Sequence, residues 1–485
     1  MYYIGVDLGT SAVKLLLMEE SGKIEKIVSK EYPLFFPHPG WSEQNPQDWM
    51  RETMAGIKEL TEDIDKTKVA GIGCGGQMHG LVTLDERDEV IRPAILWNDG
   101  RTGEETDYLN AVIGKDKLSG YTANIAFAGF TAPKILWMKK NEPENFARVK
   151  KIMLPKDYLA YCMTGSFCTD LSDASGMLLL DVKNRCWSKE MLDICGITEE
   201  QLPVLYESWQ VVGSLKPEIA AELGLSQDVK FVAGAGDNAA AAVGTGTVGD
   251  GQCNISLGTS GTVFISSREF GVDENNALHS FDHADGRYHL MGCMLSAASC
   301  NKWWSEEILN TKDFAKEQEG IVKLGENQVF FLPYLMGERS PHNNPDARAV
   351  FFGMSMDTSR AEMTQAVLEG VAFGLRDSLE VARSLGIHIE RTKICGGGAK
   401  SPLWKKIIAN VMNLKVDVPA VEEGPSMGGA MLAAVGCGAY PDVETIAEKF
   451  VHVVETVEPE SELVAKYEER YQKFKKLYPV MKELF

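Results

Sequence analysis

Apolar and glycine-rich segments alternate along this chain in a pattern that occurs twice. The strings DLGTS at 7–11 and SLGTS at 256–260 each follow a short apolar stretch and precede a second β-rich stretch, at 13–18 and 262–265. Two apolar stretches joined by a short Gly-Thr-Ser turn predict a β-hairpin. Because such a turn exposes backbone N–H groups and hydroxyls, it is suited to binding phosphate oxygens.

Two further strings match between the halves of the chain, in the same order. AGAGDNAAAAVGTG at 233–246 matches PSMGGAMLAAVGCG at 425–438, and both predict a tight turn that opens an Ala-rich helix. KVAGIGCGGQ at 68–77 matches TKICGGGAK at 392–400, and both predict a β-branched strand that runs into a glycine cluster. Chance explains one such match, but three in order favour two similar α/β halves.

The two halves differ where a carboxylate could act. Asp7 aligns with Ser256, and Asp237 aligns with Gly429, so the first half alone keeps both acids. If a cleft lies between two related domains, one side is expected to carry the metal and proton chemistry. The other side is then expected to hold a ligand through backbone and glycine contacts.

Composition and charge exclude several classes of function. The chain has 485 residues, of which 44% are hydrophobic and 24% charged, as in soluble proteins with a large core. Its 69 acidic and 49 basic residues give a net charge of −20, which disfavours nucleic acids and anionic membranes as partners. No apolar run reaches the length of a membrane helix, the N-terminus has no leader pattern, and the ten cysteines form no C-x-x-C pair. We therefore expect a cytoplasmic protein with reduced cysteines.

The common nucleotide-binding motifs do not account for the glycines. G-x-G-x-x-G occurs at 71–76 and 244–249, but only the first follows a predicted strand, and a β-like run comes next instead of a helix. The sequence contains no Walker A string and no D-F-G motif. ATP binding would therefore use another scheme, and the two Gly-Thr-Ser hairpins supply one.

Eight strings spread over residues 1 to about 440 resemble one family. They are DLGTS (7–11), WSEQNPQDW (41–49), GQMHG (76–80), ILWNDGR (95–101), GAGDNAAAAVG (234–244), SLGTSGT (256–262), YLMGERSPH (334–342) and GGGAKSPLW (396–404). The chain resembles the FGGY carbohydrate kinases, which belong to the superfamily of sugar kinases, heat-shock protein 70 and actin. Within that family it is most similar to the kinases that act on the ketopentose D-xylulose.

The resemblance implies an α/β fold of two duplicated actin-like (ribonuclease H-like) ATPase domains with an interdomain cleft. Residues 1–245 would bind the sugar and carry the base, and residues 246–485 would bind ATP, with a last helix at about 460–478 that packs back on the first domain. The implied reaction transfers the γ-phosphoryl group of ATP, with Mg²⁺, to a hydroxyl of the small-molecule sugar. Another ketose, a polyol or gluconate remains an alternative substrate, and a homodimer is the family's expectation.

The same resemblance assigns roles to the two acids. Asp237 matches the residue that accepts the sugar hydroxyl proton, and we expect it to orient the hydroxyl and take the proton late. The alternative is an N-cap of the Ala-rich helix. Asp7 matches the metal-side residue, because a carboxylate beside phosphates is repelled unless a cation such as Mg²⁺ intervenes. Its alternative is a turn-capping Asp, and Thr10 is expected to face the terminal phosphates.

Four residues are candidates for sugar contacts. Met78 and His79 follow the first glycine cluster, where family members hold their substrate; the imidazole can bond a hydroxyl and the thioether can pack on the carbon face. Asn238, beside Asp237, can donate to and accept from a hydroxyl. Trp97 offers its ring to the sugar or, equally, packs in the core.

The second half carries the candidate ATP contacts. Gly258 and Thr259 are expected to meet the phosphates, and Gly397 and Gly398 to let the backbone approach the adenosine. The string Lys400-Ser401-Pro402 differs from that of glycerol kinases, so side-chain contacts to adenine stay open.

Two other features suggest sites but have simpler explanations. His279, His283 and His289 resemble a metal cluster, yet they lie in a turn-rich stretch without helical spacing. Residues 463–478 place Leu463, Tyr467, Tyr471 and Phe474 on one helical stripe, which is typical of a surface helix that packs on a domain.

Two other classes of function remain as rivals. An actin- or chaperone-like ATPase would use ATP to drive binding, but no separate peptide-binding domain follows in the sequence. A dinucleotide oxidoreductase would bind NAD. Stimulation of ATP turnover by a sugar distinguishes a sugar kinase from both.

Overall fold

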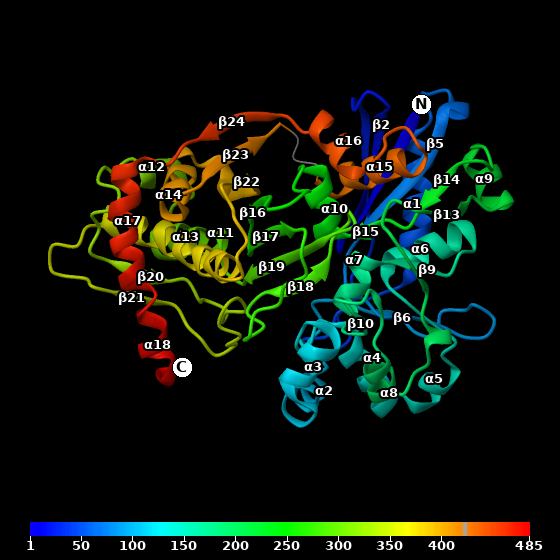
Figure 1. Ribbon diagram of the computed structural model, residues 1–485, viewed down its shortest axis with the longest axis horizontal. Helices are drawn as coiled ribbons and strands as arrows, with labels where there is room; N and C mark the ends of the chain where they lie inside the picture. The colour runs from blue at the N-terminus through cyan, green and yellow to red at the C-terminus, as the bar shows by residue number, and fades with distance from the viewer. Residues whose placement is uncertain (421–423) are drawn as a thin grey trace. The chain divides into compact units, whose positions relative to one another are not determined.

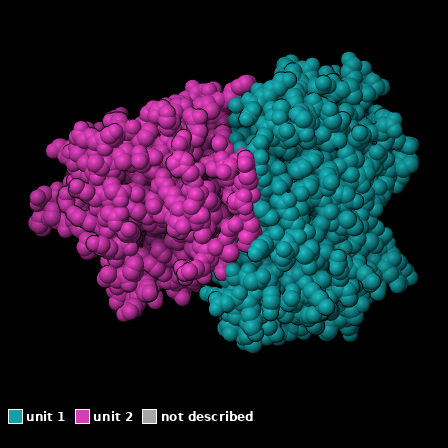
Figure 2. Space-filling model, in the orientation of Figure 1, with its two compact units in different colours: residues 1–248, 280–288, 423–451 teal, residues 249–279, 289–422, 452–485 magenta. Residues whose placement is uncertain are grey.

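The computed structural model describes residues 1–420 and 424–485, which form two compact units (Figures 1 and 2). Unit 1 comprises Met1–Val248, Ser280–Tyr288 and Glu423–Val451; unit 2 comprises Gly249–His279, His289–Glu422 and His452–Phe485. Each unit has its own mixed β-sheet and its own helices. Unit 1 therefore includes two segments from the half of the chain that the sequence assigns to the second domain.

In the sheet of unit 1, strand β5 pairs in parallel with three strands: β1 on one side, and β14 and β15 on the other. Its strands are β1 (Tyr2–Leu8), β2 (Ala12–Glu19), β3 (Ile24–Glu31), β5 (Val69–Gly76), β13 (Val211–Ser214), β14 (Lys230–Val232) and β15 (Ala235–Gly236). β1 and β2 form the predicted antiparallel hairpin. β1 also pairs with β5 in parallel, and β15 pairs with β5 in parallel near its end. The glycine cluster at 71–76 is part of β5 itself and does not follow it as a turn.

Side chains of the hairpin alternate between two helical layers. Ile4, Val6 and Leu8 face the layer formed by α1 (Pro46–Leu60) and α6 (Pro155–Thr164). Tyr3 faces the opposite layer, formed by α10 (Asp237–Gly244), α15 (Gly424–Gly436) and α16 (Val443–Phe450). Because side chains alternate along a strand, Asp7 lies on the same side of β1 as Tyr3, facing the layer that contains α10.

Unit 2 repeats the pattern of unit 1. Its strands include β16 (Cys253–Leu257), β17 (Gly261–Ser267), β19 (Tyr288–Met294), β22 (Arg391–Cys395), β23 (Lys415–Pro419) and β24 (Val453–Val457). β16 is antiparallel to β17 and parallel to β22, as β1 is to β2 and β5. The duplication predicted from the repeated strings is therefore present in the strand pairing.

The core of unit 2 is formed by the sheet and three long helices. These are α13 (Arg360–Ser384), α14 (Pro402–Met412) and α17 (Ser461–Phe474). The 25 residues of α13 are buried over most of the helix, and its Phe373 lies at the centre of an aromatic group. Within the described part of the chain, no helix combines the length and apolar character that crossing a bilayer requires.

The last long helix belongs to unit 2, which corrects the expectation that it packs on the first domain. Tyr467 and Phe474 of α17, drawn in red in Figure 1, are buried against Phe373. Arg470 forms an ion pair with the buried Glu369 of α13 at 2.7 Å. The predicted apolar stripe is present in α17, and it packs on the core of unit 2.

Candidate active site

The two acids singled out in the sequence lie at one end of the unit 1 sheet. Asp7 pairs in register with Gly75, and Gly236, which precedes Asp237, pairs with Gly76. β1 and β15 lie on opposite sides of β5, so two strand spacings of about 4.8 Å separate the two segments by roughly 10 Å. Asp7 faces the layer in which α10 begins with Asp237. The fold therefore brings together carboxylates that are 230 positions apart in the chain.

Asp237 is the first residue of α10 and is not its N-cap. The N-cap position is taken by Gly236, which makes no side-chain cap. Asp237 Oδ1 instead accepts hydrogen bonds from the backbone N–H of Asn238 at 2.7 Å and from Asn238 Nδ2 at 3.0 Å. Burial raises the pKa of Asp237 from 3.8 to about 6, although the bonds from Asn238 oppose this shift. The carboxylate is consequently an acceptor above about pH 6.

A buried chain of polar side chains supports the start of α10. Lys156 Nζ lies 2.8 Å from Asp170 Oδ1, and Asp170 Oδ2 accepts a 2.5 Å bond from Ser172 Oγ. Ser172 Oγ in turn accepts the backbone N–H of Gly236 at 3.1 Å. No motif in the sequence pointed to these residues, although a charged Lys-Asp pair at 156–157 inside an apolar stretch is a signal of a buried ion pair.

Lys156 carries its charge inside this chain. Burial alone would lower the pKa of Lys156, but the carboxylates of Asp157, Asp170 and Asp173 together hold that pKa well above its usual value. The same burial raises the pKa of Asp173 well above the usual range, and Lys156 offsets only part of this shift. The surroundings of Asp237 are therefore fixed by a buried cation and its acids.

Two glutamine side chains donate hydrogen bonds to the backbone of the turn between β1 and β2. Gln44 Nε2 donates to the Thr10 carbonyl at 2.6 Å, and Gln77 Nε2 donates to the Gly9 carbonyl at 3.4 Å. Above the turn, Trp97 Nε1 donates to Thr10 Oγ1 at 2.9 Å. Because that hydroxyl accepts from the indole, it keeps its own hydrogen for another partner.

Met78 packs between two glycines that flank the acid site. A Cβ at Gly236 would lie 3.0 Å from Met78 Cγ, and a Cβ at Gly176 would lie 2.9 Å from Met78 Cε. Met78 is only 5% exposed, so its contacts are those of a core side chain. It nevertheless packs against Gly236, the residue that precedes Asp237, and its contact with a sugar stays a prediction.

His79 has a left-handed backbone and a defined ring orientation. Its φ is 67°, which is unusual for a residue other than glycine. Nδ1 lies 2.7 Å from the Gly176 carbonyl, and the ring stacks on Phe130 with 4.7 Å between centroids. Because a carbonyl only accepts, Nδ1 must carry the hydrogen. In the neutral ring, Nε2 is then the acceptor nitrogen.

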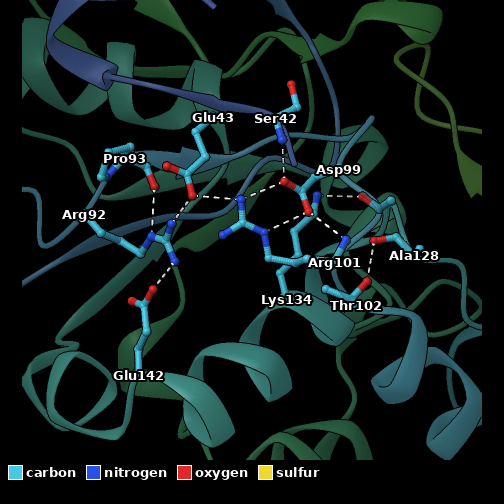
Figure 3. A network of polar contacts seen from close by, with 11 residues as sticks. Ser42, Glu43, Arg92, Pro93, Asp99, Arg101, Thr102, Ala128, Lys134 and Glu142 are labelled. Carbon is cyan, nitrogen blue, oxygen red and sulfur yellow. Dashed lines mark hydrogen bonds and ion pairs between the residues drawn. The ribbon is translucent and has the colours of Figure 1, made fainter. Parts of the chain in front are cut away.

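Trp97 is 47% exposed, so the core alternative for this residue is wrong. Its loop is held by the network of Figure 3, in which the fully buried guanidinium of Arg101 lies 2.7 Å from both Glu43 and Asp99. Asp99 also accepts the backbone N–H of Ser42 at 2.6 Å. The strings WSEQ and ILWNDGR thus meet in space and keep Trp97 over Thr10.

Unit 2 contains a cavity lined by the four ATP-contact residues predicted in the second half of the chain. The cavity has a volume of about 800 Å³, within the range of small-molecule sites. Gly258, Thr259, Gly397 and Gly398 line it. The other lining residues combine apolar, polar and cationic groups: Ala298, Ser299, Asn301, Lys302, Phe314, Ala315, Gln318, Lys400, Ser401, Pro402 and Trp404.

Hydrogen bonds fix two parts of this cavity. Ser299 Oγ donates to the Thr259 carbonyl at 2.7 Å, which ties the β16–β17 turn to the start of α11 (Ala298–Trp303). Ser401 Oγ donates to Gln318 Oε1 at 2.6 Å, so the amide nitrogen of Gln318 is its donor group. A Cβ added at Gly397 would meet no atom within 4 Å.

His283 and His289, two of the three histidines at 279–289, have separate structural contacts. His283 Nε2 lies 2.9 Å from the Thr247 carbonyl, and His289 stacks on Phe264 at 4.1 Å between centroids. The neighbouring Asp282 pairs with Arg185 Nε at 2.7 Å. Across residues 1–420 and 424–485, no group of three or more His, Cys, Asp or Glu side chains is arranged to hold a metal ion.

Family models and a curated relative match nearly the whole chain. The family model described as "FGGY family of carbohydrate kinases, N-terminal domain" matches residues 2–244, and the model of the C-terminal domain matches residues 253–437. The xylulose kinase of Escherichia coli strain K12 is 40% identical over 480 residues, covering 98% of both chains.

Solved structures of sugar kinases match along the whole chain. The structure described as a xyloylose kinase from Brucella ovis has a TM-score of 0.96 and 40% identity, covering 100% of both chains. A gluconate kinase from Lactobacillus acidophilus has a TM-score of 0.94 and 26% identity, covering 99% of this chain and 98% of that one. The predicted fold of two actin-like α/β domains is confirmed, and the cleft between them stays a prediction.

Proposed function

The chain belongs to the FGGY family of carbohydrate kinases, and on that premise we propose that it transfers the γ-phosphoryl group of ATP to D-xylulose, giving D-xylulose 5-phosphate. The observation that carries the proposal is the packing of Met78 against Gly236 in unit 1, because Gly236 directly precedes Asp237, the proposed base. The name of the near-full-length Escherichia coli relative supports a ketopentose.

Asp237 acts on the sugar hydroxyl. The hydroxyl oxygen forms a bond to the γ-phosphorus while the bond to the ADP oxygen breaks, and the hydroxyl proton passes to Asp237. An alkyl hydroxyl is, like water, a far weaker acid than a carboxyl group, so its pKa lies far above that of Asp237. Asp237 has a pKa of about 6, so full deprotonation before attack is too costly. The carboxylate therefore orients the hydroxyl and accepts its proton late in a loose transition state.

Asp7 and Thr10 fit a phosphate-bound magnesium ion. Asp7 is a half-buried carboxylate next to the Gly-Thr-Ser turn, and carboxylate oxygens are the ligands that Mg²⁺ prefers. A bound Mg²⁺ would neutralise charge on the phosphate oxygens. Asp7 would hold it from the protein side, and the Thr10 hydroxyl would donate to a phosphate oxygen.

The unit 2 cavity is the proposed ATP site. The Gly258-Thr259 turn would contact phosphates, and Gly397 would leave room for the adenosine. Gly398 also lines the cavity, but a Cβ there would meet Leu257 Cδ2 at 2.6 Å, so its lack of a side chain serves packing within unit 2. The amide nitrogen of Gln318 is oriented to donate to a ring nitrogen of adenine, because Ser401 holds its oxygen. A cytoplasmic location and a homodimer remain predictions.

A coupled assay of ADP release over a panel of sugars tests this function. We expect the highest kcat/KM with D-xylulose and much lower values with D-ribulose, gluconate and glycerol. Gluconate is included because a gluconate kinase shares the fold. A higher kcat/KM for another sugar would replace the substrate and keep the reaction class. ATP turnover that no sugar stimulates would favour the actin- or chaperone-like ATPase.

A substitution at Asp237 tests its proposed role as the base. Asp237→Ala is expected to lower kcat on the best sugar by about 10²–10⁴-fold, as removal of a general base does. KM for ATP should change little, because Asp237 is proposed to act on the sugar hydroxyl while the proposed adenosine contacts lie in unit 2. Near-normal turnover by this variant would show that another group takes the proton.

A further inference from the structure

The carbonyl of His79 is held by two side chains from a helix 50 residues away. Lys134 Nζ donates to the His79 carbonyl at 2.8 Å, and Thr131 Oγ1 donates to the same oxygen at 3.1 Å. Both donors belong to the first turn of α4 (Thr131–Asn141). Two donors on one carbonyl favour a single orientation of the peptide plane. They therefore stabilise the left-handed backbone that His79 adopts at φ 67°.

Lys134 has a second bond that reaches the Trp97 loop. Its Nζ also donates to the Gly129 carbonyl at 2.7 Å. Gly129 lies directly against Trp97, because a Cβ at position 129 would come within 2.4 Å of the Trp97 carbonyl oxygen. One amino group thus joins the segment of His79 to the segment that packs on Trp97.

Burial of the Lys134 amino group costs free energy, so its position suggests a role beyond filling space. Lys134 is 0% exposed, and burial lowers its pKa well below the usual value, with Asp99 offsetting part of the shift. Both groups to which it donates are neutral carbonyls. Figure 3 shows its side chain beside the Asp99–Arg101 pair that holds the Trp97 loop. A methionine of similar length would fill the same space without the desolvation cost.

We propose that Lys134 is a positioning residue for sugar binding, which fixes the backbone of His79 and, through Gly129, that of Trp97. The inference rests on the proposed function, because it assumes that these two residues contact the sugar. Lys134 does not touch the substrate in this account. It sets the direction of the imidazole, whose Nδ1 is bonded to Gly176, and the position of the indole over Thr10.

The substitution Lys134→Met tests the proposal in the full-length enzyme. We expect KM for D-xylulose to rise by at least 10-fold, while KM for ATP changes by less than 2-fold. Lys139→Met is the matched control, because Lys139 is an exposed residue of the same helix. Its Nζ lies 3.5 Å from the Cys195 carbonyl and 6.0 Å from the centroid of the Phe146 ring. The control should leave both KM values unchanged.

A double-mutant cycle separates positioning from a general loss of structure. The cycle compares the fold-increase in sugar KM that Lys134→Met causes in two backgrounds. If Lys134 acts through His79, this fold-increase should be at least 3 times smaller in the His79→Ala background than in the wild type. An equal effect in both backgrounds would overturn the proposal. Thr131→Val removes the second donor to the same carbonyl and should raise the sugar KM by about 3-fold. It provides the test if Lys134→Met does not fold, and an unchanged KM would then overturn the proposal.

The two proposals fail in different ways. A wild-type enzyme that phosphorylates no sugar of the panel would overturn the proposed function and this inference with it. An active wild type together with an unchanged sugar KM in Lys134→Met would overturn the inference alone. If the best sugar is not D-xylulose, the same cycle is run with that sugar and the expected ratios are unchanged.

Discussion

The indole nitrogen of Trp97 donates a hydrogen bond to the hydroxyl of Thr10 at 2.9 Å. Trp97 is the residue predicted to face the sugar, and Thr10 the residue predicted to face the terminal phosphates. A direct bond between them means that the two predicted ligand regions of unit 1 are adjacent. Transfer of a phosphoryl group to a sugar hydroxyl needs such an adjacency.

Removing the Trp97 N–H is expected to lower catalytic efficiency moderately. Trp97→Phe keeps an aromatic face and loses one hydrogen bond, worth about 0.5–1.5 kcal/mol, so kcat/KM for the sugar should fall by about 2- to 10-fold. Steady-state kinetics with varied sugar measures it. The control is Trp187→Phe, which loses a 3.2 Å bond to the Pro203 carbonyl elsewhere in unit 1 and should not affect kcat/KM. Equal losses in both variants would count against a role for the Trp97–Thr10 bond.

The pH dependence of activity should reflect Asp237. Burial raises the pKa of this carboxyl to about 6, and only the ionised form accepts a proton. The value of kcat/KM should therefore decrease about tenfold per pH unit below pH 6 and level off above it. A profile that stays flat down to pH 4.5 would be inconsistent with Asp237 as the base.

Asp237→Asn should stabilise the folded protein while it inactivates the enzyme. A pKa raised by burial means that folding favours the protonated acid. The stability from this group is present below its ordinary pKa of 3.8 and is lost as the pH rises through about 6. At pH 8 the neutral amide should therefore raise the free energy of unfolding by roughly 1–2 kcal/mol, after allowance for partial exposure. Urea unfolding at pH 8 and pH 4 measures the difference, which should vanish at pH 4.

Gly397→Ala is expected to weaken ATP binding without a loss of stability. The new methyl group would meet no atom within 4 Å, so it would extend into the open space beside the cavity. We expect KM for ATP to rise by about 10-fold and KM for the sugar to change by less than 2-fold. Gly120→Ala, on an exposed helical position with the same free space, is the control. An unchanged KM for ATP would remove Gly397 from the proposed site.

Arg101 is expected to be essential for the stability of unit 1. Arg101→Met would leave the carboxylates of Glu43 and Asp99 without their shared buried cation, which typically costs about 3–5 kcal/mol. Arg51→Met removes an exposed arginine paired with Asp48 and should cost about 0–1 kcal/mol. Thermal unfolding compares the two variants. Similar melting temperatures would show that the network of Figure 3 contributes little to stability.

Local patterns in the sequence predicted much of the fold. The β1–β2 and β16–β17 hairpins and the helices α10 and α15 appear where the repeated strings place them. These elements depend on turns and periodicities that extend over a few residues, so a short window of sequence contains the information. The apolar helical stripe that contains Tyr467 was predicted for the same reason. The surface on which the stripe packs was not predicted correctly.

The sequence was enough to single out Asp7 and Asp237, because duplication makes them visible as differences between two copies. The family resemblance singled out the glycines that line the unit 2 cavity. The sequence could not identify Lys134 beneath His79 or Ser172 beneath Gly236, since these partners are 55 and 64 positions apart. It also could not decide whether Trp97 is exposed. Such contacts arise when packed helices and loops bring distant segments to within 3 Å or so. They depend on how the whole unit packs, which no short stretch of sequence encodes.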